Sequence, residues 1–328
     1  MISCLLLAAG NGTRMKTDYP KVLAEVLNVP MLAWVLGSVI ECGIRNRCVV
    51  TGYASDKVEK FLKENNFECE TSFQSERKGT AHAVMAASDF LRRNLEGDVL
   101  IMGGDSPFID ASTITSAYKQ HTRSKSAVTI ISADLSNPYG YGRIIRNSEG
   151  DVCSIIEERE ASEVEKQITE INSGAYWFNV KSLLSAIGSI NASSLSGELY
   201  LTSIISIFIK NGLTVGAYCA PDSTIALGAN TPEELENLNN IAKQKLINSL
   251  ASRGIKIPDF EKVYISKNAE IGEGTTILSD VVINSCTKIG KNCTIGPGIV
   301  LSGETIPDNT VACIENQSLR SGEIKYAT

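Results

Sequence analysis

The chain has 328 residues, 43% of them hydrophobic, and is long enough for roughly two globular domains with full cores. Its 31 basic and 37 acidic residues leave a net charge of −6, which argues against a broad nucleic-acid or anionic-membrane footprint. An anionic ligand would therefore have to be bound by a few Lys or Arg side chains at defined positions.

The nine cysteines, an odd number with no C-x-x-C pair, suggest neither a zinc site nor a disulfide framework. We therefore expect reduced thiols and a cytoplasmic protein. The N-terminal apolar run lacks a preceding basic segment and soon meets glycine and charges, so no signal peptide is expected. No apolar stretch approaches the roughly 18 residues that a membrane span needs.

Strand and helix patterns alternate through the early part of the chain. The apolar run over 2–9 is typical of a strand buried on both faces, as a parallel sheet requires. Further strands are predicted over 48–51 and 99–102, and helices over 32–43, from Val58 onward and over 80–95. The alternation predicts an α/β fold with a Rossmann-like, mostly parallel sheet and flanking helices.

A single long helix is predicted after Asn230. The sequence Thr-Pro-Glu-Glu over 231–234 offers a Thr cap, a Pro at the first helical position and a Glu three residues after the cap. One apolar stripe then continues, so the helix should run to about Gly254 and connect two domains.

Branched aliphatic residues recur every six positions after that helix. They are Ile265, Ile271, Ile277, Ile283, Ile289, Ile295 and Leu301. The fourth residue after each is mostly small, which suits the tight corners of a parallel β-helix. The pattern resembles the left-handed hexapeptide family, where three hexads make one triangular coil, so a little over two coils are expected. The expected parts are an α/β domain over 1–230, a linker helix over 231–254 and a short left-handed β-helix over 255–328.

The first strand ends in a bare glycine turn over 10–12, with Arg14 and Lys21 just beyond. Such a turn exposes backbone N–H groups at the carboxyl edge of a parallel sheet, where α/β folds bind ligands and where phosphate oxygens can be held. Arg14 offers a planar fork and Lys21 a mobile point charge. Neither G-x-x-x-x-G-K-[ST] nor G-x-G-x-x-G opening into a helix is present, so neither a P-loop NTPase nor a Rossmann dehydrogenase is supported.

The stretch LAAGNGTRM (7–15), followed by PKVL (20–23), resembles the signature of sugar-1-phosphate nucleotidyltransferases. It is most similar to the uridyltransferase half of bacterial bifunctional N-acetylglucosamine-1-phosphate uridyltransferase/glucosamine-1-phosphate acetyltransferases. Further matches follow in order: FQSERKGTAHAV (73–84), MGGDSPFI (102–109), NPYGYGRIIR (137–146), IIEE (155–158), EINSGAY (170–176), GELYLT (197–202) and ALGAN (226–230).

Carried over residue by residue, the resemblance implies a nucleotide site, a sugar site and a metal site. The nucleotide would lie against Leu7, Ala8, Ala9 and Gly10, with Gln74, Gly79 and Thr80 around the base. The sugar would lie near Gly140, Glu157, Asn172, Tyr200 and Thr202. Mg²⁺ would be held by Asp105 and Asn230, and Arg14 and Lys21 would be the catalytic cations.

The implied reaction is in-line attack of a sugar-1-phosphate oxygen on the α-phosphorus of a nucleoside triphosphate, with release of pyrophosphate. The attacking oxygen is already anionic, so charge neutralisation is needed and a general base is not. Mg²⁺ commonly takes only one or two oxygen ligands from protein. Asp105 follows a buried strand and Gly-Gly, which favours a ligand over a helix cap, whereas Asn230 as a ligand rests on the resemblance alone. We expect neither His82 nor His121 to hold a metal or act as a base.

This chain departs from the family at Asn11, Arg77, Gly103 and Ser203. Asn11 stands where Lys is common, and Arg77 where a Gln near the base is usual, so uracil selection could be altered or another sugar accepted. The retained sugar and base residues still favour UTP and an N-acetylhexosamine 1-phosphate. Because the chain stops about 25 residues after Leu301, whereas later coils build the acetyl-CoA site of the bifunctional enzymes, we expect no acetyl transfer.

The leading hypothesis is thus a uridyltransferase that makes UDP-N-acetylglucosamine, assembled as a homo-oligomer, with a trimer through the β-helix as in its relatives. A nucleotidyltransferase for another sugar, or for dTTP or CTP, is the first alternative. A non-catalytic sugar-nucleotide sensor is the second, although a sensor has no need for the full set of phosphoryl-transfer residues. A hexapeptide acyltransferase is the third, but the repeat contains no His to deprotonate an acceptor.

Overall fold

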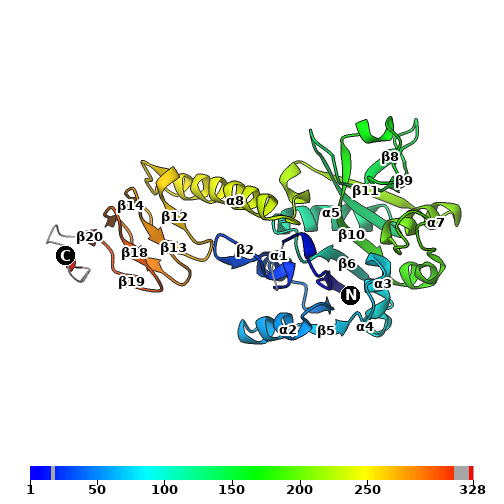
Figure 1. Cartoon of the computed structure of the whole chain (residues 1–328), viewed down its shortest axis with the longest axis horizontal. Coiled ribbons are helices and arrows are strands. Elements are labelled where there is room, and N and C mark those ends of the chain that lie inside the picture. The colour runs from blue at the N-terminus through cyan, green and yellow to red at the C-terminus, as the bar shows by residue number, and fades with distance from the viewer. Residues whose placement is uncertain (16–18, 314–324, 328) are drawn as a thin grey trace. The chain divides into compact units, whose positions relative to one another are not determined.

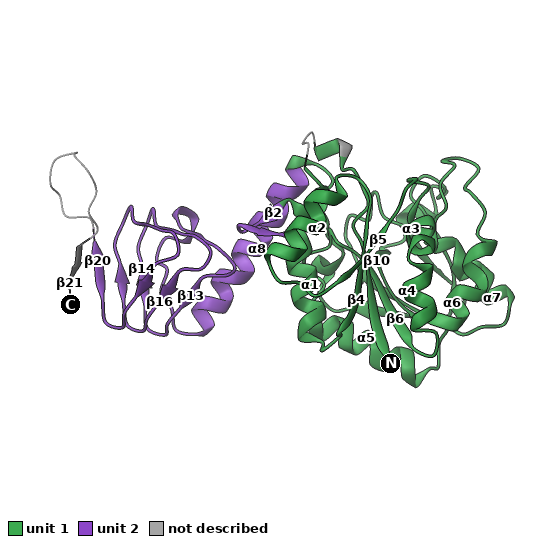
Figure 2. Cartoon of the chain, turned by 90° about the horizontal axis from the view of Figure 1, so that it is seen from below, with its two compact units in different colours: residues 1–24, 31–232 green, residues 25–30, 233–328 purple. Residues whose placement is uncertain are grey.

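The computed structural model describes residues 1–15, 19–313 and 325–327. The chain divides into two compact units: unit 1 comprises Met1–Ala24 and Met31–Pro232, and unit 2 comprises Glu25–Pro30 and Glu233–Thr328 (Figure 2). Within the described residues, no helix combines the length and the apolar run that a transmembrane segment requires. All nine cysteines fall within these residues and none forms a disulfide.

Unit 1 is built on one mixed sheet (Figure 1). Its strands are β1 (Ile2–Leu7), β4 (Asn46–Thr51), β5 (Glu70–Phe73), β6 (Asp98–Gly103), β7 (Val128–Asp134), β8 (Arg143–Arg146), β9 (Val152–Ile156), β10 (Glu170–Asn179) and β11 (Val215–Ala220). The order is β11-β7-β10-β6-β1-β4-β5, with the β8–β9 hairpin attached to β10. The pairs β1–β4, β1–β6, β4–β5 and β7–β11 are parallel, whereas β10 runs antiparallel to both β6 and β7. The expected mostly parallel α/β sheet is therefore confirmed.

Alternating side chains of the central strands enter two separate cores. Leu5, Val50 and Ile101 lie in one core, packed against helices on one face of the sheet. Leu6 and Met102 lie in the other core, packed against helices on the opposite face. Covering both faces explains why these strands read as unbroken apolar runs in the sequence.

The helices of unit 1 are α1 (Met31–Glu41), α2 (Ser55–Glu64), α3 (Thr80–Ala86), α4 (Ser88–Arg93), α5 (Ala111–Arg123), α6 (Val180–Ala186) and α7 (Ile204–Lys210). The single helix expected over 80–95 is in fact two, because Ala87, with φ −96° and ψ 19°, leaves the helical conformation between α3 and α4.

Unit 2 contains the long helix α8 (Pro232–Ser252) and a β-helix of hexapeptide repeats. Its coil strands are β12 (Tyr264–Ile265), β13 (Glu270–Ile271), β14 (Thr276–Ile277), β15 (Val282–Ile283), β16 (Lys288–Ile289), β17 (Thr294–Ile295), β18 (Val300–Leu301), β19 (Thr305–Ile306) and β20 (Val311–Cys313). They form three parallel sheets, β12-β15-β18, β13-β16-β19 and β14-β17-β20, and β21 (Lys325–Ala327) pairs antiparallel with β20. All seven in-phase aliphatic residues are buried in one core, which confirms the short left-handed β-helix.

The β-helix continues beyond the strict period of six. Ile283 pairs with Leu301, 18 residues later, but Ile289 pairs with Ile306, only 17 residues later. One residue is therefore missing from the corner after Leu301, and Ile306 and Ala312 carry the core onward out of phase. Each sheet of the described β-helix thus holds three stacked coil strands, so the expected little over two coils was too low.

A small hairpin that the sequence did not predict precedes α1. It consists of β2 (Glu25–Val26) and β3 (Val29–Pro30), paired antiparallel, and it groups with unit 2 although the residues on either side of it belong to unit 1.

Candidate active site

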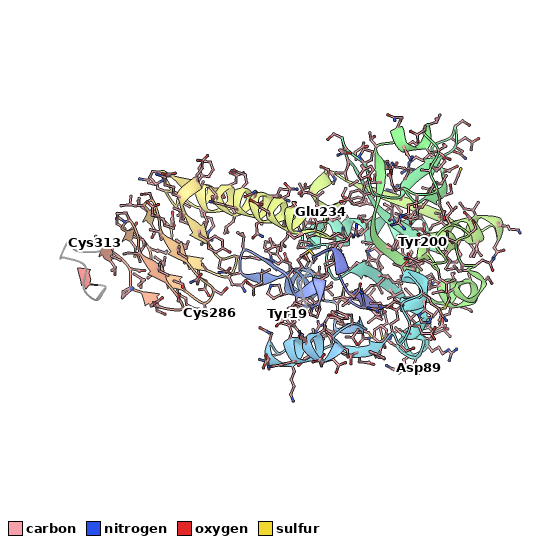
Figure 3. The ribbon with its side chains drawn as sticks, in the orientation of Figure 1. Tyr19, Asp89, Tyr200, Glu234, Cys286 and Cys313 are labelled. Carbon is pink, nitrogen blue, oxygen red and sulfur yellow. The ribbon has the colours of Figure 1, made fainter. Side chains whose placement is uncertain are left out.

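A pocket of about 460 Å³ opens at the carboxyl ends of β1 and β6 in unit 1. Predicted site residues in its lining are Leu7, Ala9, Gly10, Lys21, Gln74, Gly79, Thr80, Asp105 and Tyr200; the last of these is labelled in Figure 3. Asn11, Val22, Arg77, Ala83, Gly103, Ser106, Ser173, Gly174 and Glu198 complete the lining. A hollow of about 510 Å³ elsewhere, lined around 189–195, contains no Lys or Arg and so does not suit a polyphosphate.

Four predicted residues, Arg14, Lys21, Asp105 and Asn230, contact one another and are called here the charged cluster; of these, Lys21 and Asp105 line the pocket. Lys21 Nζ forms an ion pair with Asp105 Oδ2 and donates a hydrogen bond to Asn230 Oδ1 at 2.6 Å. Arg14 Nη2 donates to the same Asn230 oxygen at 3.0 Å. The side chains of Lys21 and Asp105 are 13% and 28% exposed, so the ion pair is partly desolvated and still reachable from solvent. Residues more than 200 positions apart thus converge on one amide oxygen.

Glycines allow the close approaches within the charged cluster. Gly12 has φ +56°, and a Cβ there would lie 2.8 Å from Lys21 Cβ. A Cβ on Gly103 would lie 2.5 Å from Asp105 Oδ1, and one on Gly228 would lie 2.9 Å from the Asp105 carbonyl oxygen. These contacts are shorter than side chains tolerate, so Gly12, Gly103 and Gly228 leave the space that Lys21 and Asp105 occupy.

The donor set fits a magnesium ion. Asp105 Oδ2 and Asn230 Oδ1 both contact the single Nζ atom of Lys21, so the two oxygens lie within reach of one compact cation. A carboxylate and an amide oxygen are hard ligands, and Mg²⁺ uses one or two such groups from protein together with phosphate and water. Among the described residues, no three His, Cys, Asp or Glu side chains gather as a metal site, which excludes a zinc-type cage from that part of the chain.

The loop expected around the base is held by a network that the sequence did not predict. The Gln74 amide is buried, and its Nε2 lies 3.2 Å from the Gly79 carbonyl oxygen and 3.1 Å from His82 Nδ1. Gly79 has φ +107°, and the Leu201 N–H donates to Thr80 Oγ1 at 2.9 Å. His82 is therefore an orienting partner of Gln74, which its position two residues after Thr80 on α3 could have suggested.

Glu157 and Thr202, two of the residues expected near the sugar, form a hydrogen bond. Thr202 Oγ1 donates to Glu157 Oε1 at 2.8 Å. Burial raises the pKa of Glu157 above its ordinary value of 4.5, although the bond from Thr202 opposes the shift. Burial, together with the nearby Glu157 charge, also raises the pKa of Tyr176.

Tyr176 and Asn172 form a second pair. Asn172 Nδ2 donates to the Tyr176 hydroxyl at 2.7 Å, and Asn172 Oδ1 accepts from the Gly174 N–H at 3.1 Å. The four residues Glu157, Asn172, Tyr176 and Thr202, of which the last two are buried and the first two half-buried, are called here the buried cluster. Tyr176, which the sequence reasoning missed, lies four residues after Asn172 in the same EINSGAY stretch.

Like Glu157, Asn172 and Thr202, the remaining predicted site residues, Ala8 and Gly140, do not line the pocket. Ala8 is buried, and its N–H donates to the Val50 carbonyl at 2.9 Å. The N–H of Gly140, which is exposed, donates to Glu158 Oε2 at 3.0 Å, and the same oxygen accepts from the buried Arg143 guanidinium at 2.7 Å. Gly140 is thus fixed by an ion pair that connects the start of β8 to the end of β9.

Comparisons with known proteins identify the family of this chain. A family profile described as nucleotidyl transferase matches residues 3–225, and one described as bacterial transferase hexapeptide (six repeats) matches residues 268–303. The chain is 38% identical over 302 residues to "Bifunctional protein GlmU" of Caldanaerobacter subterraneus subsp. tengcongensis, covering 92% of this chain and 65% of that protein. It is 36% identical over 321 residues to the protein of the same name from Streptococcus thermophilus, covering 97% of this chain and 69% of that protein.

The chain spans about two thirds of the length of these relatives. A solved structure from Bacillus anthracis, described as a putative glucose-1-phosphate thymidylyltransferase in complex with sucrose, matches with a TM-score of 0.61 at 21% identity, covering 74% of this chain and 95% of that one. The likeness to this solved structure shows a shared fold. The family profiles and the identity to the bifunctional relatives show that the chain belongs to the nucleotidyl transferase family, with a C-terminal hexapeptide-repeat region.

Proposed function

We propose that the chain is a Mg²⁺-dependent uridyltransferase that forms UDP-N-acetylglucosamine and pyrophosphate from UTP and N-acetylglucosamine 1-phosphate. The contact of one ammonium group, that of Lys21, with oxygens of both Asp105 and Asn230 at the wall of the pocket carries the proposal. Transfer of a nucleotidyl group between two polyanions requires placed positive charge and hard oxygen ligands, and the charged cluster offers both.

In this reaction an oxygen of the sugar 1-phosphate attacks the α-phosphorus, and the bond from that phosphorus to the bridging oxygen of the β-phosphate breaks. Lys21 would stabilise the charge on the two reacting phosphates, and Arg14 would bind the triphosphate tail. Asp105 and Asn230 would hold Mg²⁺, which when bound neutralises charge on phosphate oxygens. Proton transfer to a base is not required, because the attacking oxygen is already ionised.

The choice of sugar rests on the buried cluster and on the sequence motifs around it. Glu157 and Thr202 already share a hydrogen bond, and the Asn172 amide is held between Tyr176 and the Gly174 N–H. Preorganised hydrogen-bonding groups of this kind suit the hydroxyl and amide groups of an N-acetylated sugar.

The test is product identification by mass spectrometry, with purified protein, Mg²⁺, UTP and N-acetylglucosamine 1-phosphate. UDP-N-acetylglucosamine should form, and should be lost when the metal is chelated. A competition series with dTTP, CTP and other hexose 1-phosphates defines the preferred pair. No product across the series, with folded protein, would contradict the enzyme and favour a sugar-nucleotide sensor, which a thermal shift on adding UDP-N-acetylglucosamine would detect.

A transferase for another nucleotide or sugar is the second candidate, and Arg77 favours it. This exposed guanidinium lines the pocket and, within the described part of the chain, makes no hydrogen bond or ion pair. It adds a cation on the side of the pocket expected to hold the base. A dTTP or CTP preference in the competition series, removed by Arg77→Gln, would establish this alternative.

The absence of acetyl transfer, a trimer and a cytoplasmic location remain predictions. An acetyl-CoA assay with glucosamine 1-phosphate tests the first, and light scattering after size-exclusion chromatography tests the second.

A further inference from the structure

Two residues of the charged cluster stand immediately before the points where the chain passes from unit 1 to unit 2. Lys21 precedes the hairpin that begins at Glu25, and Asn230 precedes the main segment of unit 2, which begins at Glu233. These two side chains share the 2.6 Å hydrogen bond described above. Contacts that fix the chain segments after Lys21 and after Asn230 therefore act within a few residues of these two side chains.

The hairpin has a strained tip. Leu27 and Asn28, its two turn residues, have φ +50° and +57°. A two-residue turn of this type needs positive φ at both positions, which Asn tolerates and Leu does not favour. A backbone of this kind persists only where surrounding contacts determine it.

Contacts within unit 2 hold the backbone of Leu27 in this conformation. The Leu27 side chain is buried, with 2% of its surface exposed. Its N–H donates to Asn239 Oδ1 of α8 at 2.9 Å, and its carbonyl accepts from Ser266 Oγ at 3.1 Å and from the Lys267 N–H at 3.3 Å. Both the helix and the first coil of the β-helix therefore hold this residue.

Asn28 is held by side chains of two successive coils. Its Oδ1 accepts from the Tyr264 hydroxyl at 2.8 Å, and its Nδ2 donates to Asn284 Oδ1 at 3.0 Å. The Asn28 carbonyl accepts from Ser285 Oγ at 3.5 Å. The hairpin, shown in the colour of unit 2 in Figure 2, is thus bonded to that unit through backbone and side chains alike.

The segment that connects Lys21 to the hairpin is short and hydrogen-bonded. Residues Lys21–Leu23 form a single helical turn in which Val22 and Leu23 are buried. The Ala24 N–H donates to the Lys21 carbonyl at 3.0 Å, and the Met31 N–H donates to the Ala24 carbonyl at 2.9 Å. A displacement of the hairpin would therefore reach Lys21 with few intervening torsions to absorb it.

We propose that the Leu27–Asn28 tip is a positioning element for the phosphoryl-transfer site, through which unit 2 holds Lys21 against Asp105 and Asn230. The inference rests on the proposed function for its kinetic readout. It assigns the β-helix a part in nucleotidyl transfer in addition to any role in assembly.

The experiment compares Asn28→Ala with Asn309→Ala. Asn309 also has positive φ, +59°, and lies exposed in the last described coil, so its replacement imposes the same kind of backbone strain away from the hairpin. Asn28→Gly is a third variant that keeps the backbone conformation and removes only the bonds to Tyr264 and Asn284. All are assayed below the onset of thermal unfolding, which is measured for each.

We expect Asn28→Ala to lower kcat for pyrophosphate release about tenfold or more, with a smaller change in KM for the nucleotide. Asn28→Gly should show a partial loss, and Asn309→Ala should match the wild type. Equal kcat values for Asn28→Ala and Asn309→Ala, with an active wild type, would overturn the inference.

A second readout separates this inference from the proposed function. Amide hydrogen exchange in a peptide covering 19–24 should accelerate in Asn28→Ala and stay unchanged in Asn309→Ala. The exchange measurement tests the positioning role even if the wild type releases no pyrophosphate. That outcome would reject the proposed function alone. Unchanged exchange at 19–24 in Asn28→Ala would reject the positioning role.

Discussion

The charged cluster and the buried cluster, both in unit 1, hold their polar side chains in different ways. In the charged cluster, Lys21 is held by an opposite charge and an amide oxygen, and the ion pair stays partly exposed. In the buried cluster, the carboxyl of Glu157 is held by burial and a single hydroxyl, and its pKa rises. The first arrangement suits a polyanion, and the second suits uncharged sugar groups. Substitutions should therefore affect rate and nucleotide affinity in the first, and pH response in the second.

The largest effect is expected from Asp105→Asn in the charged cluster. Replacing the carboxylate by an amide leaves Lys21 without its ion-pair partner and, under the proposed role, removes the anionic ligand of Mg²⁺, so kcat should fall about 10² to 10³-fold. Pyrophosphate release over a range of Mg²⁺ concentrations measures the loss. Asp89→Asn, an exposed carboxylate paired with Arg92 on α4, is the matched control and should keep wild-type activity. Comparable activity in the Asp105 and Asp89 variants would remove Asp105 from the site.

Arg14→Ala should have the second largest effect, and it should change nucleotide binding more than the rate of the chemical step. The variant loses a charged donor to Asn230 and, under the proposed role, to the triphosphate tail, a loss of about 1.5–3 kcal/mol for such a bond. KM for the nucleotide should rise by about tenfold or more, with a smaller change in kcat. A loss confined to kcat would show that Arg14 acts on the reacting phosphates instead of on the tail.

Arg77→Gln should have a smaller and salt-dependent effect. Because the Arg77 guanidinium is exposed, its attraction for a nucleotide is screened and should contribute about 0–1 kcal/mol. A rise of up to about fivefold in the nucleotide KM at low salt, vanishing at high salt, is the expected outcome. Arg92→Gln serves as the control because Arg92 is an exposed cation that does not line the pocket. A large, salt-independent change in the Arg77 variant would instead indicate direct base recognition.

The smallest effect concerns the pH dependence of stability in the buried cluster. The raised pKa of Glu157 means that the folded state binds its proton more tightly than the unfolded state. The resulting stabilisation is complete below the ordinary value of 4.5 and is lost as pH rises through the folded pKa. Glu157→Gln should therefore gain stability relative to wild type as pH rises above 4.5, measured by denaturant unfolding.

Glu170→Gln provides the opposite sign as a control. Although burial opposes the shift, bonds from Arg146 and Ser132 lower the pKa of Glu170. Its stabilisation is therefore present above the unfolded pKa and lost as pH falls through the folded value. Identical pH profiles for Glu157→Gln and the wild type would show that the Glu157 carboxyl is solvated in the folded protein.

Sequence patterns predicted much of the architecture because the physics behind them is local. Strands covered on both faces must be apolar throughout, which marked β1 and β6, and a coil of eighteen residues must repeat its core position, which marked the β-helix. The period of six is broken where one residue is missing from a corner of the β-helix, so Ile306 and Ala312 were not predicted as core residues.

The parts of the site that sequence could not supply depend on long-range contacts. The hairpin over 25–30 is too short to show a period, and its turn is held by partners such as Asn284, far along the chain. The contact of Gln74 with His82 arises only because the loop folds back on α3. In contrast, Arg14 and Lys21 could be selected as candidate cations from their place after the glycine turn, and the structure shows both on one oxygen of Asn230.

The most direct test of the central claim is the rate of pyrophosphate release by wild type and Lys21→Ala, with UTP, N-acetylglucosamine 1-phosphate and Mg²⁺. We expect turnover by wild type and a loss of about 10²-fold or more in kcat for the folded variant, because the ammonium that contacts both Asp105 and Asn230 is gone. Equal turnover by the two proteins would contradict it, since the charged cluster would then have no part in the reaction.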